Sequence, residues 1–220
     1  MSSEQERQIL RLQAAAEHGD LDAQFELGCI YQTGEGAPQN SQEAVRWFRQ
    51  AAEGGDIEAQ FNLAVLYLTG EGVPRNADMA ASWFLRAAQQ GDQEAQFNLA
   101  CLYDLGDGVP QDFARAVHWY RKAADNGKAE AQFNLGLKYH KGEGVEQDYD
   151  LAFHWFREAA NRNYAKAQLN IGLMYSNGLG VTQDFQKAAK WFIKADRGGD
   201  HDAKAHLQAL YDQKLARPYD

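Results

Sequence analysis

Residues 59–74 read AQFNLAVLYLTGEGVP, and the phrase returns as AQFNLACLYDLGDGVP at residues 95–110 and AQFNLGLKYHKGEGV at residues 131–145. The three copies begin 36 residues apart, and all the tryptophans keep the same step. These are Trp47, Trp83, Trp119, Trp155 and Trp191. A step that no insertion interrupts predicts an array of repeated units, which stack because one unit cannot bury its own apolar face.

The sequence pattern within one repeated unit predicts a helical hairpin. From residue 59 to residue 69 the apolar residues recur at the 3.6-residue spacing of a helix. Asp56 is placed to cap the start of this helix, and Gly70 follows its last apolar residue, where a left-handed residue commonly ends a helix. After the loop GEGVPRN, a second helix begins near Asn76 and ends at Gly91. The fold class is therefore all-α.

The two ends of the chain match only half a unit each. Residues 3–18 correspond to a second helix, with Arg11 where a tryptophan would fall, and residues 203–213 correspond to a first helix. Polar residues at these places suit caps that face solvent. The last residues, KLARPYD, are expected to form a short frayed tail. Between the caps we expect five repeats in one domain of 220 residues, at 23–58, 59–94, 95–130, 131–166 and 167–202.

Composition excludes several kinds of partner. The net charge is −9, with no basic cluster of the kind that binds nucleic acid. No apolar run is long enough to span a bilayer, which needs about 18 residues. The start, MSSEQERQIL, lacks the apolar core of a signal peptide. We expect a cytoplasmic protein without membrane insertion, although a periplasmic chain whose signal peptide has been removed stays open.

The motifs AQFNLG, GEGV, WF and AA at fixed offsets resemble the Sel-one-like repeat family, relatives of the tetratricopeptide repeats. The resemblance covers residues 15–211 or so and implies a right-handed α-solenoid that acts as an adaptor or scaffold for other proteins. One bacterial branch of the family has a disulfide in each repeat and has been linked to β-lactam binding. This sequence differs, because Cys29 and Cys101 are 72 residues apart, in the first and the third repeat. A disulfide needs Cα atoms within about 7 Å, which a regular monomer does not offer to two residues separated by a whole repeat.

The sequence contains no recognisable catalytic constellation. The Gly-x-Gly loops lack the third glycine of a dinucleotide site and follow a helix rather than a strand. No serine begins a Ser-x-x-Lys motif. His118 and His154 are 36 residues apart, at a position where other units have Arg46, Ser82 or Lys190, and such a position is expected to be solvated. We therefore predict a protein that is not an enzyme and needs no cofactor or metal.

A partner site is predicted on the concave face, which the first helix of each unit lines in solenoids of this kind. After the packing stripes are removed, one stripe remains on these helices. Its asparagines resemble those with which tetratricopeptide repeats bind a peptide backbone; its apolar residues would add contacts, and its lysines would hold a carboxylate. The predicted residues are Asn62, Leu66, Asn98, Leu102, Asn134, Lys138, Lys141, Asn170 and Met174. The asparagines are equally consistent with a structural bond to a loop of the neighbouring unit.

The function that these observations favour is a scaffold that binds a peptide or protein partner as a monomer. Two alternatives stay open. One is a weak β-lactam-binding hydrolase, by analogy with the cysteine-rich branch. The other is a structural protein that associates end to end through its caps.

Overall fold

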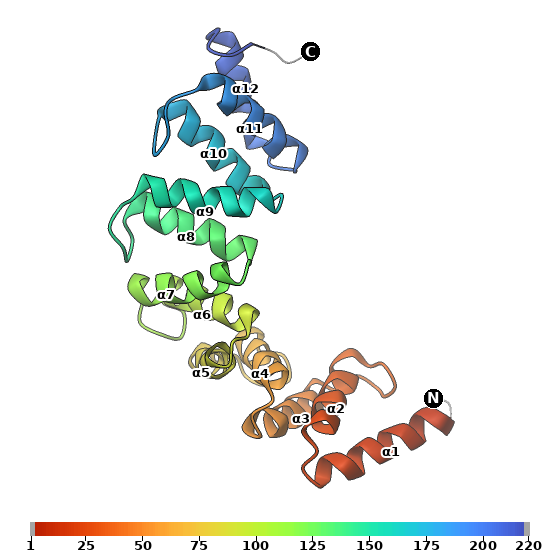
Figure 1. The fold of residues 1–220 in the computed structure, drawn as a ribbon. Coiled ribbons are helices and arrows are strands. Elements are labelled where there is room, and N and C mark those ends of the chain that lie inside the picture. The colour runs from red at the N-terminus through yellow and green to blue at the C-terminus, as the bar shows by residue number, and fades with distance from the viewer. Residues whose placement is uncertain (1–2, 218–220) are drawn as a thin grey trace. The chain divides into compact units, whose positions relative to one another are not determined.

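The computed structural model describes residues 3–217, and all regular structure in that range is helical (Figure 1). The helices are α1 (Ser3–Glu17), α2 (Leu21–Thr33), α3 (Ser41–Glu53), α4 (Ile57–Thr69), α5 (Ala77–Gln89), α6 (Gln93–Leu105), α7 (Phe113–Asp125), α8 (Ala129–Lys141), α9 (Tyr149–Asn161), α10 (Ala165–Asn177), α11 (Phe185–Arg197) and α12 (Asp202–Asp212). The all-α prediction, with two helices in each period of 36 residues, is confirmed.

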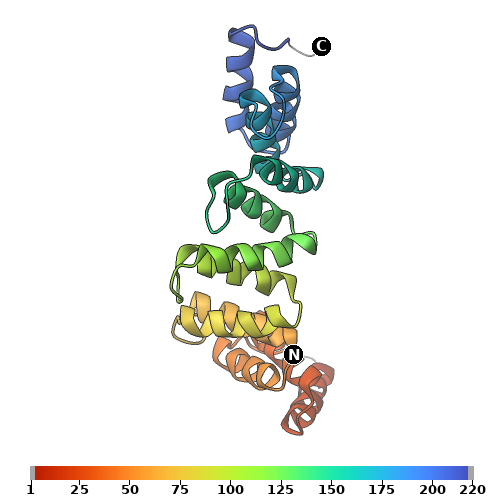
Figure 2. The same cartoon turned by 60° about the vertical axis from the view of Figure 1, so that its left-hand side comes forward.

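The helices form two compact units, with the division between Gln111 and Asp112. Unit 1 holds α1 to α6 and unit 2 holds α7 to α12. In each unit every helix packs against the helices before and after it in the sequence. Figure 2 shows this succession within each unit from a second direction.

The local signals of the repeat act as predicted. In unit 1, Asp56 caps α4 by accepting a hydrogen bond from the backbone N–H of Ala59. Gly70 ends the same helix with φ +79°, the left-handed conformation that favours glycine. Unit 2 departs from this pattern. Lys128 and Tyr164 stand at the starts of α8 and α10, and neither side chain caps its helix.

The core of each unit consists of aromatic rings against small residues. Phe48 and Phe156 are fully buried, and an added Cβ at Gly28 or Gly136 would lie within 2.7 Å of the ring opposite it. The absence of a side chain at these two glycines therefore lets the first helix approach the aromatic ring of its second helix closely. Three of the tryptophans are also in the core, since Trp47, Trp83 and Trp119 are at most 9% exposed.

The end of the chain is more ordered than the predicted frayed tail. The backbone N–H of Leu215 donates to the carbonyl of Leu210, and Ala216 is buried. Arg217 exchanges two hydrogen bonds with the side chain of Gln186, at 3.0 and 3.2 Å. Lys214 takes a positive φ of 57° at the position that the helix-ending glycine occupies in the repeats. Pro218 to Asp220 lie outside the described residues.

Candidate functional site

The predicted asparagines lie on the first helices and are half-buried. Asn62, Asn98 and Asn170 each donate from Nδ2 to the backbone carbonyl four residues earlier, at 2.8 to 3.0 Å. Each therefore bonds its own helix. The structural alternative, a hydrogen bond to a loop of the neighbouring repeat, is not what these side chains make. Because an amide offers two donors and one oxygen, each of these side chains keeps hydrogen-bonding capacity for a partner.

The apolar part of the predicted stripe is wrong as a contact surface. Leu66 is 0% exposed, Leu102 is 4% exposed and Met174 is 1% exposed. A first helix is covered by its own second helix and by that of the preceding repeat, so more of its circumference is packed than the sequence analysis assigned to packing. These three residues contribute to stability and present no surface to a partner.

Lys138 is also misassigned as a free cation. It is 6% exposed, and its Nζ lies 2.8 Å from Oε2 of Glu143 and 4.5 Å from the ring centre of Phe113. Its charge is satisfied inside unit 2, because a buried ammonium must be paired. Lys141 remains exposed, with Nζ 3.8 Å from the other oxygen of Glu143.

This pairing gives a test by pH. The hydrogen bond from Lys138 lowers the pKa of Glu143 despite partial desolvation. A lowered folded-state pKa means that the unfolded chain binds the proton more readily, so the stabilisation is present above the ordinary glutamate pKa of about 4.3 and is lost as pH falls through the lowered value. In a carboxyl NMR titration, Lys138→Met should return the pKa of Glu143 toward its ordinary value, whereas Lys141→Met should change it less. Equal effects of the two variants would contradict the pairing.

The charge on the first helices differs between the units. In unit 1, α2, α4 and α6 contain no lysine or arginine, and their acidic residues are Asp22, Glu26, Glu58, Glu94 and Asp104. In unit 2, α8 and α10 carry Lys138, Lys141 and Lys166 against a single acidic residue, Glu130. Every lysine of the chain lies in unit 2. The first-helix face, meaning the exposed side of these helices in each unit, is thus acidic in unit 1.

The arginines of unit 1 do not neutralise that face, since those beyond α1 lie on second helices or in a loop. Arg49 donates to the hydroxyl of Tyr67 at 2.8 Å, and Arg75 pairs with Asp107. Arg46 and Arg86 lie over tryptophan rings. Burial raises the pKa of Cys29, and the nearby carboxylates of Glu58, Glu26 and Asp56 raise it further.

Neither Cys29 nor Cys101 is part of a disulfide. The raised pKa keeps the Cys29 thiol protonated, which is unfavourable for a nucleophile. Between residues 3 and 217, no group of three histidine, cysteine or acidic side chains is arranged to hold a metal ion. His118 and His154 are exposed, and each ring lies steeply inclined to that of the tryptophan next to it, at 83° and 72°.

Sequence reasoning missed a row of buried glutamines. The glutamine of each AQ pair donates to an alanine carbonyl eight residues earlier, at the end of the preceding helix, and so ties one repeat to the next. The pairs are Gln24 with Ala16, Gln60 with Ala52, Gln96 with Ala88, Gln132 with Ala124 and Gln168 with Ala160. The recurrence of AQ at the 36-residue step was the available signal.

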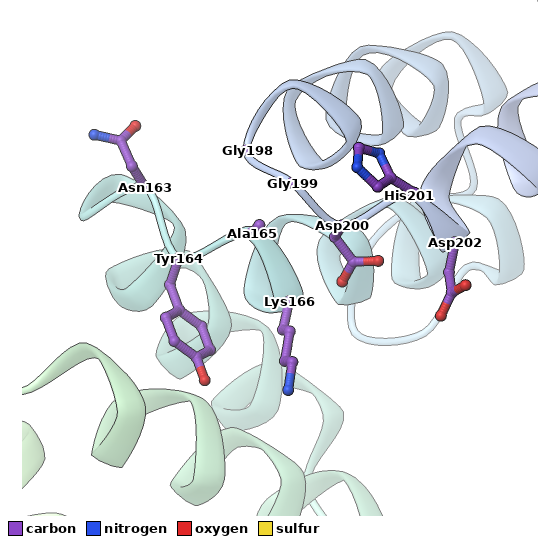
Figure 3. Close-up of a pocket in the computed structure, with 9 residues that line it drawn as sticks. All are labelled: Asn163, Tyr164, Ala165, Lys166, Gly198, Gly199, Asp200, His201 and Asp202. Carbon is purple, nitrogen blue, oxygen red and sulfur yellow. The ribbon is translucent and has the colours of Figure 1, made fainter.

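It also missed two adjoining hollows in unit 2. One, about 540 Å³ in volume, lies between the turn at Asn163–Lys166 and the turn at Gly198–Asp202 (Figure 3). The other, about 520 Å³, shares Asn163 and Gly198 with it and is lined further by Gln168, Lys194 and Arg197. The signal in the sequence was the pair Asn163–Tyr164, which stands where four of the other turns have Gly-Asp.

Comparison with known proteins finds the same repeat. A family model described as the Sel1 repeat matches residues 21–56, 57–92, 93–128, 129–164 and 165–200. The protective antigen c5321 of uropathogenic Escherichia coli, described as displaying an SLR fold, is 37% identical, with a TM-score of 0.87 over 92% of this chain and 44% of its own. A Sel1 repeat protein from Oxalobacter formigenes is 30% identical, with a TM-score of 0.86 over 92% of this chain and 84% of its own.

This chain thus spans less than half the length of the Escherichia coli antigen. Comparison with curated protein sequences gave no match. In the described part of the chain, no helix is both long enough and apolar enough to cross a membrane.

Proposed function

The chain belongs to the Sel1 repeat family, and from that premise we propose that it is a non-catalytic scaffold that binds an extended segment of a protein partner on its first-helix face. The observation that supports this most directly is the asparagine at one position of successive first helices. Asparagine is a poor helix former. These side chains donate to a carbonyl of their own helix and remain partly accessible.

The charge of the face favours one kind of segment in unit 1. Glu26, Glu58 and Glu94 stand on successive first helices with no lysine or arginine among them. Potentials across an interface are usually complementary, so the part of a partner that contacts unit 1 is expected to be basic. On α8 and α10, Lys141 and Lys166 are the exposed cations that would meet acidic groups, in place of the buried Lys138.

The test separates binding from folding. The double variant Asn62→Ala and Asn98→Ala should lose capture of the partner from lysate of the source organism. Its stability should rise slightly, by up to about 1 kcal/mol, because alanine is the better helix former. The matched control is Ser82→Ala with Gln89→Ala on the exposed side of α5, which should capture as the wild type does.

Capture should also weaken with added salt, as charge-based recognition does. Two results would count against the proposal. Unchanged capture by the asparagine variant would move the site off this face. A clear loss of thermal stability in that variant would make the asparagines structural.

A further inference from the structure

The Gly198 hollow, meaning the hollow of about 520 Å³ in unit 2, stands where the turn between α5 and α6 of unit 1 has the side chain of Gln90. In unit 1, the Oε1 atom of Gln60 accepts a hydrogen bond from Nε2 of Gln90 at 2.9 Å. The same Nε2 lies 3.4 Å from the carbonyl oxygen of Gly55. Gln90 thus supplies a donor to two acceptors at the turn between α5 and α6.

Three repeats later, in unit 2, the acceptors recur without the donor. Gln168 takes the place of Gln60, Asn163 that of Gly55, and Gly198 that of Gln90. Gln168 is 5% exposed, and its Nε2 donates a hydrogen bond to the carbonyl oxygen of Ala160 at 3.3 Å. Its Oε1 is buried and accepts no hydrogen bond from any described residue. A buried carbonyl without a donor is costly, and this side chain lines the hollow.

The charged side chains around the hollow are cations. Lys194 and Arg197 line it, and Lys166 lines the adjoining hollow with Asp200 and Asp202 (Figure 3). Among residues 3–217 none of these three cations forms an ion pair, although Nζ of Lys194 lies 4.2 Å from the ring centre of Trp191. A ligand that suits this place has an N–H for Gln168 and an anionic group beside it.

We propose that the Gly198 hollow binds the free C-terminal end of a peptide. The last backbone N–H donates to Oε1 of Gln168, and the C-terminal carboxylate pairs with Lys194 and Arg197. A lysine or arginine side chain also carries donors, but the rim cations repel it. A phosphate monoester dianion satisfies the cations but has no hydrogen to donate to the glutamine oxygen. The site lies at the turns that precede α10 and α12, so it does not depend on the first-helix face.

The experiment is an NMR titration of the ¹⁵N-labelled full chain with N-acetyl-tetraalanine that has a free carboxylate. The backbone signals of Gly198, Gly199 and Asn163 and the side-chain amide of Gln168 should shift together. The same peptide with a C-terminal carboxamide should bind at least about tenfold more weakly, because it loses a charge-assisted interaction. Equal binding of the two peptides overturns the proposal.

Two variants test the geometry. Gly198→Gln should abolish the shifts at Asn163 and Gln168, since Gln90 and Gly198 share nearly the same backbone conformation, with φ −84° and −81°. Its Cβ would lie 3.0 Å from that of Ala165, so the start of α10 must yield slightly. Lys194→Gln with Arg197→Gln should weaken binding at least about tenfold, because both charges that pair with the carboxylate are removed.

Wild-type affinity in either variant overturns the proposal, and so does inorganic phosphate shifting the same signals as strongly as the peptide. The variant Asn62→Ala with Asn98→Ala serves as the control and should bind the peptide as the wild type does. The outcome is therefore independent of the scaffold proposal.

Discussion

Gly72→Ala should lower the free energy of unfolding by roughly 2–5 kcal/mol in urea titrations followed by circular dichroism, through a strained backbone and a steric clash. Gly72 has φ +71°, and a Cβ there would lie 2.2 Å from the backbone oxygen of Ser41, the first residue of α3. The second glycine of the loop is where one repeat touches the backbone of the one before it. A side chain must push the two apart.

The matched control is Gly91→Ala. Gly91 also has a positive φ, of 99°, but an added Cβ would meet nothing within 4 Å. This variant bears only the conformational strain, of about 1–2 kcal/mol. If Gly72→Ala loses no more stability than Gly91→Ala, the loop does not dock against α3.

Phe84→Ala is expected to cost about 3–5 kcal/mol, the range for removing a fully buried aromatic side chain. Phe84 is 0% exposed, and its ring centre lies 5.6 Å from that of Phe61. The ring fills the space between α4 and α5, which a smaller side chain leaves as a cavity. Because neighbouring repeats supply each other's contacts, hydrogen exchange should show lost protection in α4 and α5 first.

Ser82→Ala, two residues away on the exposed side of the same helix, should change stability by less than about 0.5 kcal/mol. If Phe84→Ala unfolds at as high a urea concentration as Ser82→Ala, the assignment of this ring to the core is contradicted. Phe84→Leu should fall between the two, since it removes fewer buried atoms.

The candidate site was only partly predictable. Asn62 and its equivalents could be found because mid-helix asparagine is unfavourable and so conspicuous. Leu66 and Lys138 could not be placed, since the spacing of residues along one helix does not say how many neighbours cover that helix. For the same reason Lys138 appeared free, whereas Glu143 and Phe113 of unit 2 enclose it.

The sequence by itself determined the helices, their ends and the period, because these depend on local spacing, caps such as Asp56 and glycines such as Gly70. The tertiary structure decided which of the repeated residues are used up within the fold. The buried glutamines, the contact of Gly72 with α3 and the open acceptor on Gln168 all join residues of different helices. Such contacts depend on how the helices pack against one another, which local spacing, caps and helix-ending glycines do not specify.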